Sequence, residues 1–208
     1  MSMKKNKSPR LILSIFLAVL FALTTNQAAA SAPLSIVKSS VDAIIAILKE
    51  NGLDREQKRE RIRSIVLERF DFIEMSKRIL GPNWNTLSHG DQNAFVNRFK
   101  RLLEASYVNK IEAYTDEQVV FENEIIKGRY AKVESKAITK TADIPIDYVM
   151  IQKDGEWFVY DVIIENVSLI SNYRSTYNEI IKKNGFAHLI EEMDSKIQEL
   201  SNSPNPKG

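Results

Sequence analysis

The chain has 208 residues, no cysteine, and a nearly balanced charge of 29 basic and 27 acidic side chains. Without cysteine it can form no disulfide, thiolate nucleophile or thiolate metal site, and the charge balance gives no basic excess for binding nucleic acid. Its length is sufficient for one domain that buries most of its surface on folding.

Residues 1–32 are expected to form a secretory signal peptide. Four basic residues precede an apolar run over residues 11–23, and the small-residue stretch AAASA follows at 28–32. Such an arrangement is typical of a cleaved leader, whereas a membrane-spanning helix needs about 20 apolar residues. Cleavage before Ser31 or before Pro33 would fit the small residues equally well.

The mature chain is expected to be a single exported domain. A leader with no cysteine at its cleavage site provides no lipid anchor, so we expect release as a soluble protein. Removal of four basic residues would leave 25 basic against 27 acidic side chains. We expect the domain to span residues 33–201 and residues 202–208, with two prolines, to form a flexible tail.

Helical spacing of apolar residues predicts the first two elements. A helix should run through Val37–Leu48, and Asn51-Gly52 is expected to end it in a left-handed conformation. Asp54 has Gln57 three residues later, the spacing of an N-terminal capping box, so a second helix should begin there.

Two further helices follow the same capping pattern. Asp71 with Glu74 should start a short helix that Gly81-Pro82 ends. Ser88 with Asp91 should start the most regular helix of the chain. Its apolar stripe, expected to carry much of the core, is Phe95, Phe99, Leu102 and Leu103.

From residue 119 the pattern changes to short runs rich in β-branched and aromatic residues. Four strands are predicted, over 119–126, 130–139, 144–152 and 156–164. Short turns separate them, and short turns join antiparallel neighbours, so the strands should form a meander. Apolar and charged residues alternate in the second run, which indicates one covered face and one wet face.

The C-terminal part is predicted to be helical. Ser168 should cap a helix that ends at Asn184-Gly185, and a final amphipathic helix should reach Leu200. No repeat and no internal linker is evident. The fold class is therefore α+β, with one four-stranded antiparallel sheet and several helices.

Signals for catalysis are lacking. The two histidines, His89 and His188, have no recognisable serine or aspartate partners, and the seven glycines form no nucleotide-binding motif. The carboxylate pairs Glu191-Glu192 and Glu122/Glu124 are interpreted as solvated surface. The sequence therefore predicts no enzyme, no metal and no cofactor.

Asp161 is unusual because it interrupts the apolar run Trp157–Ile164. A buried carboxylate needs a hydrogen-bonding or cationic partner. We expect Arg174 to be that partner, so that Asp161 and Arg174 form a structural polar pair.

Three stretches resemble one protein family. The last of them, Trp157–Arg174, is the most specific, because it matches nearly every position of the family signature W-x-V-Y-D-V-x-x-E-G-V-S-L-x-x-N-Y-R. Asn166 replaces the signature glycine, and asparagine tolerates a left-handed backbone. The stretches are Phe70-Asp71-Phe72 with Met75, Leu80-Gly81 and Trp84; the helix from Phe95 to Tyr107; and Trp157–Arg174. On these residues the chain resembles the Mla (maintenance of lipid asymmetry, or toluene tolerance) periplasmic phospholipid-binding proteins, auxiliary components of an ABC transporter.

The resemblance implies a cystatin-like fold in which a twisted antiparallel sheet, wrapped by helices, encloses an apolar cavity for acyl chains. It implies a carrier that moves phospholipid between an outer-membrane lipoprotein complex and an inner-membrane ABC transporter with an MCE-domain subunit, and so maintains outer-membrane lipid asymmetry. Phospholipid would be cargo and no cofactor is implied. We expect a monomer.

The cavity should be lined by plain hydrophobic residues, because each acyl methylene exposed to water costs about 0.8 kcal/mol. The hypothesised lipid-binding residues are Val119, Phe121, Val133, Ile146, Tyr148, Met150, Trp157 and Val159 on the sheet, with Leu80, Leu103, Tyr107, Leu169 and Tyr173 on the helices.

Two alternatives remain, because these side chains would look the same in a solid core. One is an exported adaptor with a filled interior and no ligand. The other is a small hydrolase of the same fold, which would need two or more titratable side chains converging in the cavity.

Overall fold

The computed structural model describes residues 32–112 and 118–202. The predicted signal peptide, apart from Ala32, and the predicted tail beyond Asn202 lie outside these residues. The helices are α2 (Pro33–Lys49), α3 (Arg55–Arg69), α4 (Phe72–Leu80), the 3-10 helix η1 (Gly81–Thr86), α5 (His89–Glu112), α6 (Leu169–Asn184) and α7 (Phe186–Asn202); the strands are β1 (Gln118–Lys127), β2 (Tyr130–Ile138), β3 (Asp143–Lys153), β4 (Glu156–Ile164) and β5 (Val167–Ser168). No helix within the described ranges is both long and apolar enough to cross a bilayer.

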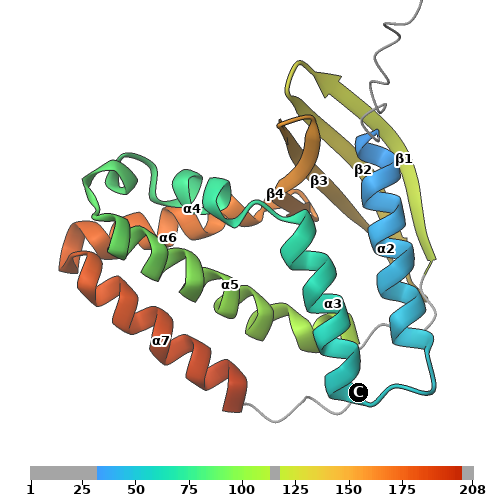
Figure 1. Ribbon diagram of the computed structural model, residues 1–208, viewed down its shortest axis with the longest axis horizontal. Coiled ribbons are helices and arrows are strands. Elements are labelled where there is room, and N and C mark those ends of the chain that lie inside the picture. The colour runs from blue at the N-terminus through green and yellow to red at the C-terminus, as the bar shows by residue number, and fades with distance from the viewer. Residues whose placement is uncertain (1–31, 113–117, 203–208) are drawn as a thin grey trace, which may run out of the picture. The chain divides into compact units, whose positions relative to one another are not determined.

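The strands form one antiparallel sheet in chain order, which confirms the predicted meander (Figure 1). The expected count of four strands was wrong, because β5 adds two residues that pair with the end of β4. The chain reverses directly at Glu165 and Asn166, whose φ angles are 50° and 66°. Two consecutive left-handed residues make the tight turn of a hairpin, which confirms the left-handed backbone expected at Asn166.

The alternation predicted for the second run is confirmed in β2, whereas in β3 the adjacent residues Met150 and Ile151 are both buried, so the opposite face is not wet throughout. In β2, Val133 and Ser135 are buried between half-buried charged neighbours. Val133 lies opposite Tyr148 of β3, which in turn lies opposite Val162 of β4. We call the face that carries these residues the inner face. Helix α2 packs on it against β1 and β2 (Figure 1).

The predicted helix starts are present, with each cap donating or accepting as expected. Asp54 and Gln57 form a complete capping box, and Asp71 accepts a hydrogen bond from the backbone N–H of Glu74. The Ser88 hydroxyl accepts one from the N–H of Asp91 at 3.1 Å. These bonds satisfy backbone donors that the first turn of a helix leaves unpaired.

The left-handed end predicted for α2 was wrong. The helix ends at Lys49 and the next residue, Glu50, is extended; neither Asn51 nor Gly52 has a positive φ. Side chains of α3 take over the capping role. Lys58 Nζ donates to the carbonyl oxygen of Leu48 at 2.7 Å, so a terminal carbonyl is satisfied without a left-handed glycine.

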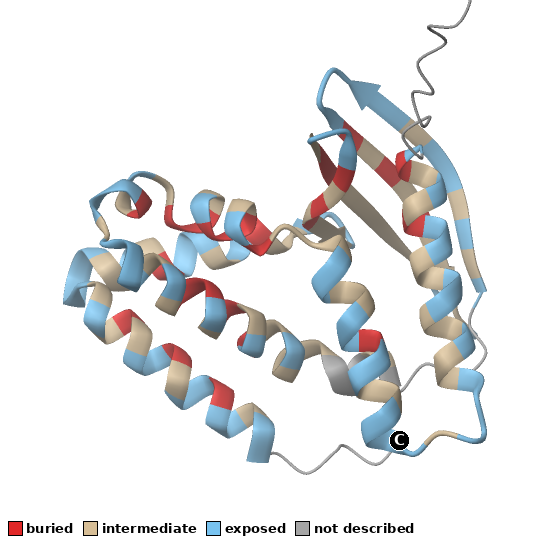
Figure 2. Ribbon diagram, viewed as in Figure 1, coloured by how far each residue is buried: buried red, intermediate tan, exposed pale blue. Residues whose placement is uncertain are grey.

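The buried hydrophobic residues form two separate cores, which Figure 2 shows as red groups in the helices and at one end of the strands. The helical core comprises Phe72, Met75, Ile79, Leu80, Trp84, Phe95, Val96, Phe99, Leu102, Ile170, Tyr177, Leu189, Met193 and Ile197. The sheet core comprises Val37, Ala131, Val133, Met150, Trp157 and Val159. Phe70, at the end of α3, packs against both cores, and the adjacent N–H of Asp71 donates to the carbonyl of Val159 at 2.9 Å.

Candidate functional site

The inner face of the sheet has two unlike halves. Near the β1–β2 and β3–β4 turns, residues such as Val133 and Met150 are completely buried in the sheet core. Toward the opposite ends of the strands, Val119, Ile146 and Ile164 retain accessible surface although they are apolar and share the same face. Only one half of this apolar face is therefore filled by packing from the described residues.

Five of the hypothesised lipid-binding residues lie in the packed cores. The exposed fraction is 0% for Leu80, Val133 and Met150, 5% for Trp157 and 3% for Val159. A side chain with no accessible area touches neither solvent nor an internal space that admits water. In this structure Leu80, Val133 and Met150 are therefore packed entirely against other parts of the protein.

The other eight hypothesised residues keep part of their accessible surface. They come from α5, β1, β3 and the start of α6, elements that are separated in sequence. They are Leu103, Tyr107, Val119, Phe121, Ile146, Tyr148, Leu169 and Tyr173.

Sequence reasoning missed Val162. Strict alternation from Trp157 and Val159 would have placed Asp161 on the inner face. A register shift between Val149 and Met150 instead pairs Met150 with Val159 and Tyr148 with Val162. This shift turns Val162 inward and Asp161 outward. A β-bulge of this kind inserts one extra residue and leaves no recognisable mark in the sequence here.

The predicted pairing of Asp161 with Arg174 was wrong. The carboxylate accepts hydrogen bonds from the Ser168 hydroxyl at 2.6 Å and from the Ile170 N–H at 3.0 Å. Arg174 is exposed, and its guanidinium lies beside Gly81. Asp161 is a structural residue, as expected, but its role is to fix the start of α6. That start positions Leu169 and Tyr173.

Asp161→Ala should lower the free energy of unfolding by about 1–3 kcal/mol, because it leaves the N–H of Ile170 and the Ser168 hydroxyl without their acceptor. Urea denaturation would measure the change. Arg174→Ala is the matched control and should change stability by less than about 0.5 kcal/mol. An equal loss in the two variants would restore the ion-pair interpretation.

Protein surrounds most of the Tyr148 side chain, yet its hydroxyl keeps accessible surface. Burial raises the pKa of its phenol to about 12, so the side chain lies in a poorly hydrated interior. The hydroxyl makes no hydrogen bond within the described part of the chain. In that part, every fully buried side-chain oxygen or nitrogen has a hydrogen-bond partner. The Tyr148 hydroxyl must therefore be accessible. The hydroxyl therefore keeps accessible surface on the inner face, although protein surrounds most of the side chain.

Tyr173 of α6 packs against the helical core. Its ring contacts Phe99 edge-on, with the centroids 5.3 Å apart. Burial raises its pKa, while a side-chain hydrogen bond with Ser106 of α5 acts in the opposite direction. Tyr107 is close enough to add to the rise. The phenol of Tyr173 therefore already has a protein partner.

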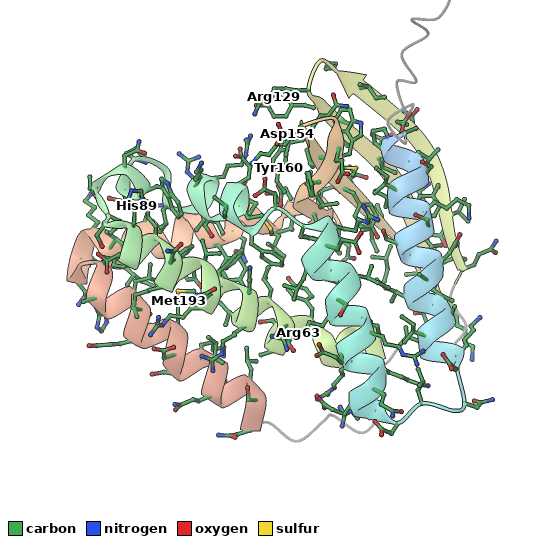
Figure 3. The ribbon with its side chains drawn as sticks, in the orientation of Figure 1. Arg63, His89, Arg129, Asp154, Tyr160 and Met193 are labelled. Carbon is green, nitrogen blue, oxygen red and sulfur yellow. The ribbon has the colours of Figure 1, made fainter. Side chains whose placement is uncertain are left out.

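Carboxylates do not gather on the inner face. Among the strand residues that the structure describes, Glu124 is the one carboxylate on this face, and it accepts the N–H of Leu34 at 2.6 Å. It therefore serves as a cap for α2. His89 lies at the end of α5 away from the sheet (Figure 3), and His188 lies 2.9 Å from Glu192 on α7. No group of three or more potential metal ligands occurs in the described ranges.

Comparisons with known proteins identify relatives of this chain. A curated relative from Haemophilus influenzae, an intermembrane phospholipid transport system binding protein, is 22% identical over 199 residues, which cover 91% of each chain. A solved phospholipid-binding protein from Ralstonia solanacearum, determined in complex with a phospholipid, has a TM-score of 0.76 at 20% identity and covers 83% of this chain and 100% of its own. The structural likeness confirms the α+β fold.

The family model described as MlaC protein matches residues 38–195. The match includes all the described strands, both hydrophobic cores apart from Val37 and Ile197, and the segment Trp157–Arg174 on which the resemblance mainly depends. Since it spans well over half of the sequence, this chain belongs to the MlaC protein family.

Proposed function

We propose that this chain is a periplasmic phospholipid carrier that holds acyl chains against the open half of the inner face. Family membership supports the proposal, as do the phospholipid transport named for the Haemophilus relative and the phospholipid bound by the Ralstonia protein. The relatives are named for binding and transport, which supports a non-enzymatic role.

The observation that carries the proposal is the accessible hydroxyl of Tyr148 in a poorly hydrated interior. A filled core would leave no such group. Val119 and Ile146 on the same face are apolar and also only half-buried. These features support an enclosed apolar space and oppose the adaptor alternative, which requires a solid interior.

The energetic need for such a space is large. An acyl tail of about fifteen methylenes costs on the order of 12 kcal/mol to expose to water, and two tails cost about twice as much. Plain hydrophobic walls offset this cost, while the charged headgroup keeps its solvation in water. The eight partly exposed residues and Val162 are the proposed wall.

The proposed route lies between an outer-membrane lipoprotein complex and an inner-membrane ABC transporter with an MCE-domain subunit. The carrier would dock with each in turn as a monomer, after its leader has been cleaved, and so maintain outer-membrane lipid asymmetry. The sequence has no nucleotide-binding motif, so its partners would supply the direction of transport.

Protein expressed with its own leader and purified from the periplasm should carry phospholipid. Native mass spectrometry should show adducts of phospholipid mass, and organic extraction should release lipids that can be identified. Protein that remains free of lipid, and takes up none from vesicles, would contradict the carrier and favour the adaptor.

A further inference from the structure

The proposed lipid space beside Tyr148 is bordered on the sheet by apolar residues, apart from the tyrosine hydroxyl itself. Its cross-strand neighbours on the inner face are Val133 and Val162. The nearest hydroxyl along β2 is that of Ser135, which already donates to the carbonyl of Ile146 at 2.8 Å. Within the described residues, Tyr148 therefore presents an unpaired donor to a hydrophobic surrounding.

Such a donor restricts what can fill the space. Buried tyrosine hydroxyls usually have a hydrogen-bond partner, and water can supply one while the space is empty. A hydrocarbon tail that displaced this water would leave the hydroxyl unsatisfied, which opposes binding. A ligand that places an acceptor beside the hydroxyl avoids this penalty.

A phospholipid has one kind of strong acceptor next to its tails, the carbonyl oxygen of each ester. We propose that the Tyr148 hydroxyl donates a hydrogen bond to an ester carbonyl of the bound lipid and so fixes how deep the lipid sits. This inference rests on the proposed carrier function. It implies selection for ester-linked lipids, because ether oxygens are weaker acceptors than ester carbonyls.

The test compares two lipids with identical tails and headgroup, a diester phosphatidylethanolamine and its diether analogue. The wild-type protein should bind the diester about two- to twelve-fold more tightly, the range expected for one net hydrogen bond between neutral groups. Tyr148→Phe keeps the ring and removes the hydroxyl, so it should bind both lipids with similar affinity. Tyr130→Phe makes the same change at an exposed tyrosine and should keep the preference.

Infrared spectra of bound lipid with isotope-labelled ester carbonyls give an independent readout. A hydrogen-bonded carbonyl band should be present in the wild-type complex and lost in Tyr148→Phe. If the wild-type protein binds neither lipid, the carrier function itself fails. If it binds both equally, or its carbonyl band lacks the shift, the Tyr148 contact is refuted while the carrier function stands; the wild-type measurements decide this even if the variant does not fold.

Discussion

Tyr148→Asp should reach the periplasm folded but without phospholipid. The hydroxyl of Tyr148 keeps accessible surface, so an aspartate there can be hydrated by water in the empty protein. Acyl tails would have to displace that water and leave a carboxylate in an apolar surrounding. This desolvation costs about 3 kcal/mol or more, which weakens lipid binding at least about a hundredfold.

Extraction of lipid from equal amounts of folded protein would measure the loss, with circular dichroism to confirm folding. Tyr130→Asp is the matched control, because Tyr130 is 40% exposed and lies opposite Ile151 on the other face of the sheet. This control should retain wild-type lipid. Full lipid retention by folded Tyr148→Asp would mean that the tails occupy another part of the molecule.

Val133→Arg should prevent folding. Val133 has no accessible area and packs in the sheet core, so an arginine there would bury a charge with no partner and overfill the space. The combined penalty exceeds about 5 kcal/mol, which is comparable with the whole stability of a typical domain. Low periplasmic yield and the absence of a cooperative thermal transition would show it.

A milder substitution tests the same expectation even if Val133→Arg yields no folded protein. Val133→Ala should fold and lose about 2 kcal/mol through the cavity it creates. Val120→Arg makes the same arginine substitution at a valine that is 39% exposed on β1, and it should change stability by no more than about 0.5 kcal/mol. A stable, cooperatively folding Val133→Arg would show that the sheet core is not packed as described.

The sequence predicted features that depend on residues a few positions apart. The caps at Asp54, Asp71 and Ser88 were confirmed because each side chain bonds a backbone N–H within its own first turn. Asn184-Gly185 ended α6 as predicted, with φ of 86° at the glycine. The alternation in β2 was confirmed because side-chain direction in a strand follows directly from position.

The errors concern partners that are distant in the chain. Asp161 pairs with Ser168 and Ile170 because the register shift in β4 points it away from the inner face. Asn51-Gly52 looked like a helix end, yet a side chain from α3 satisfies the terminal carbonyl of α2. A sequence records the donors and acceptors but not which of them meet.

The sequence by itself determined the family resemblance, the fold class, the positions of the helices and of the four long strands, and which residues of β2 share a face. Tertiary structure alone decided which of those apolar residues are fully buried and which keep accessible surface. Val133 and Tyr148 lie directly opposite each other on one face, yet one has no accessible area and the other has an accessible hydroxyl. Alternation fixes the direction of a side chain, whereas the packing of α2 and the helices over the sheet determines what that side chain meets.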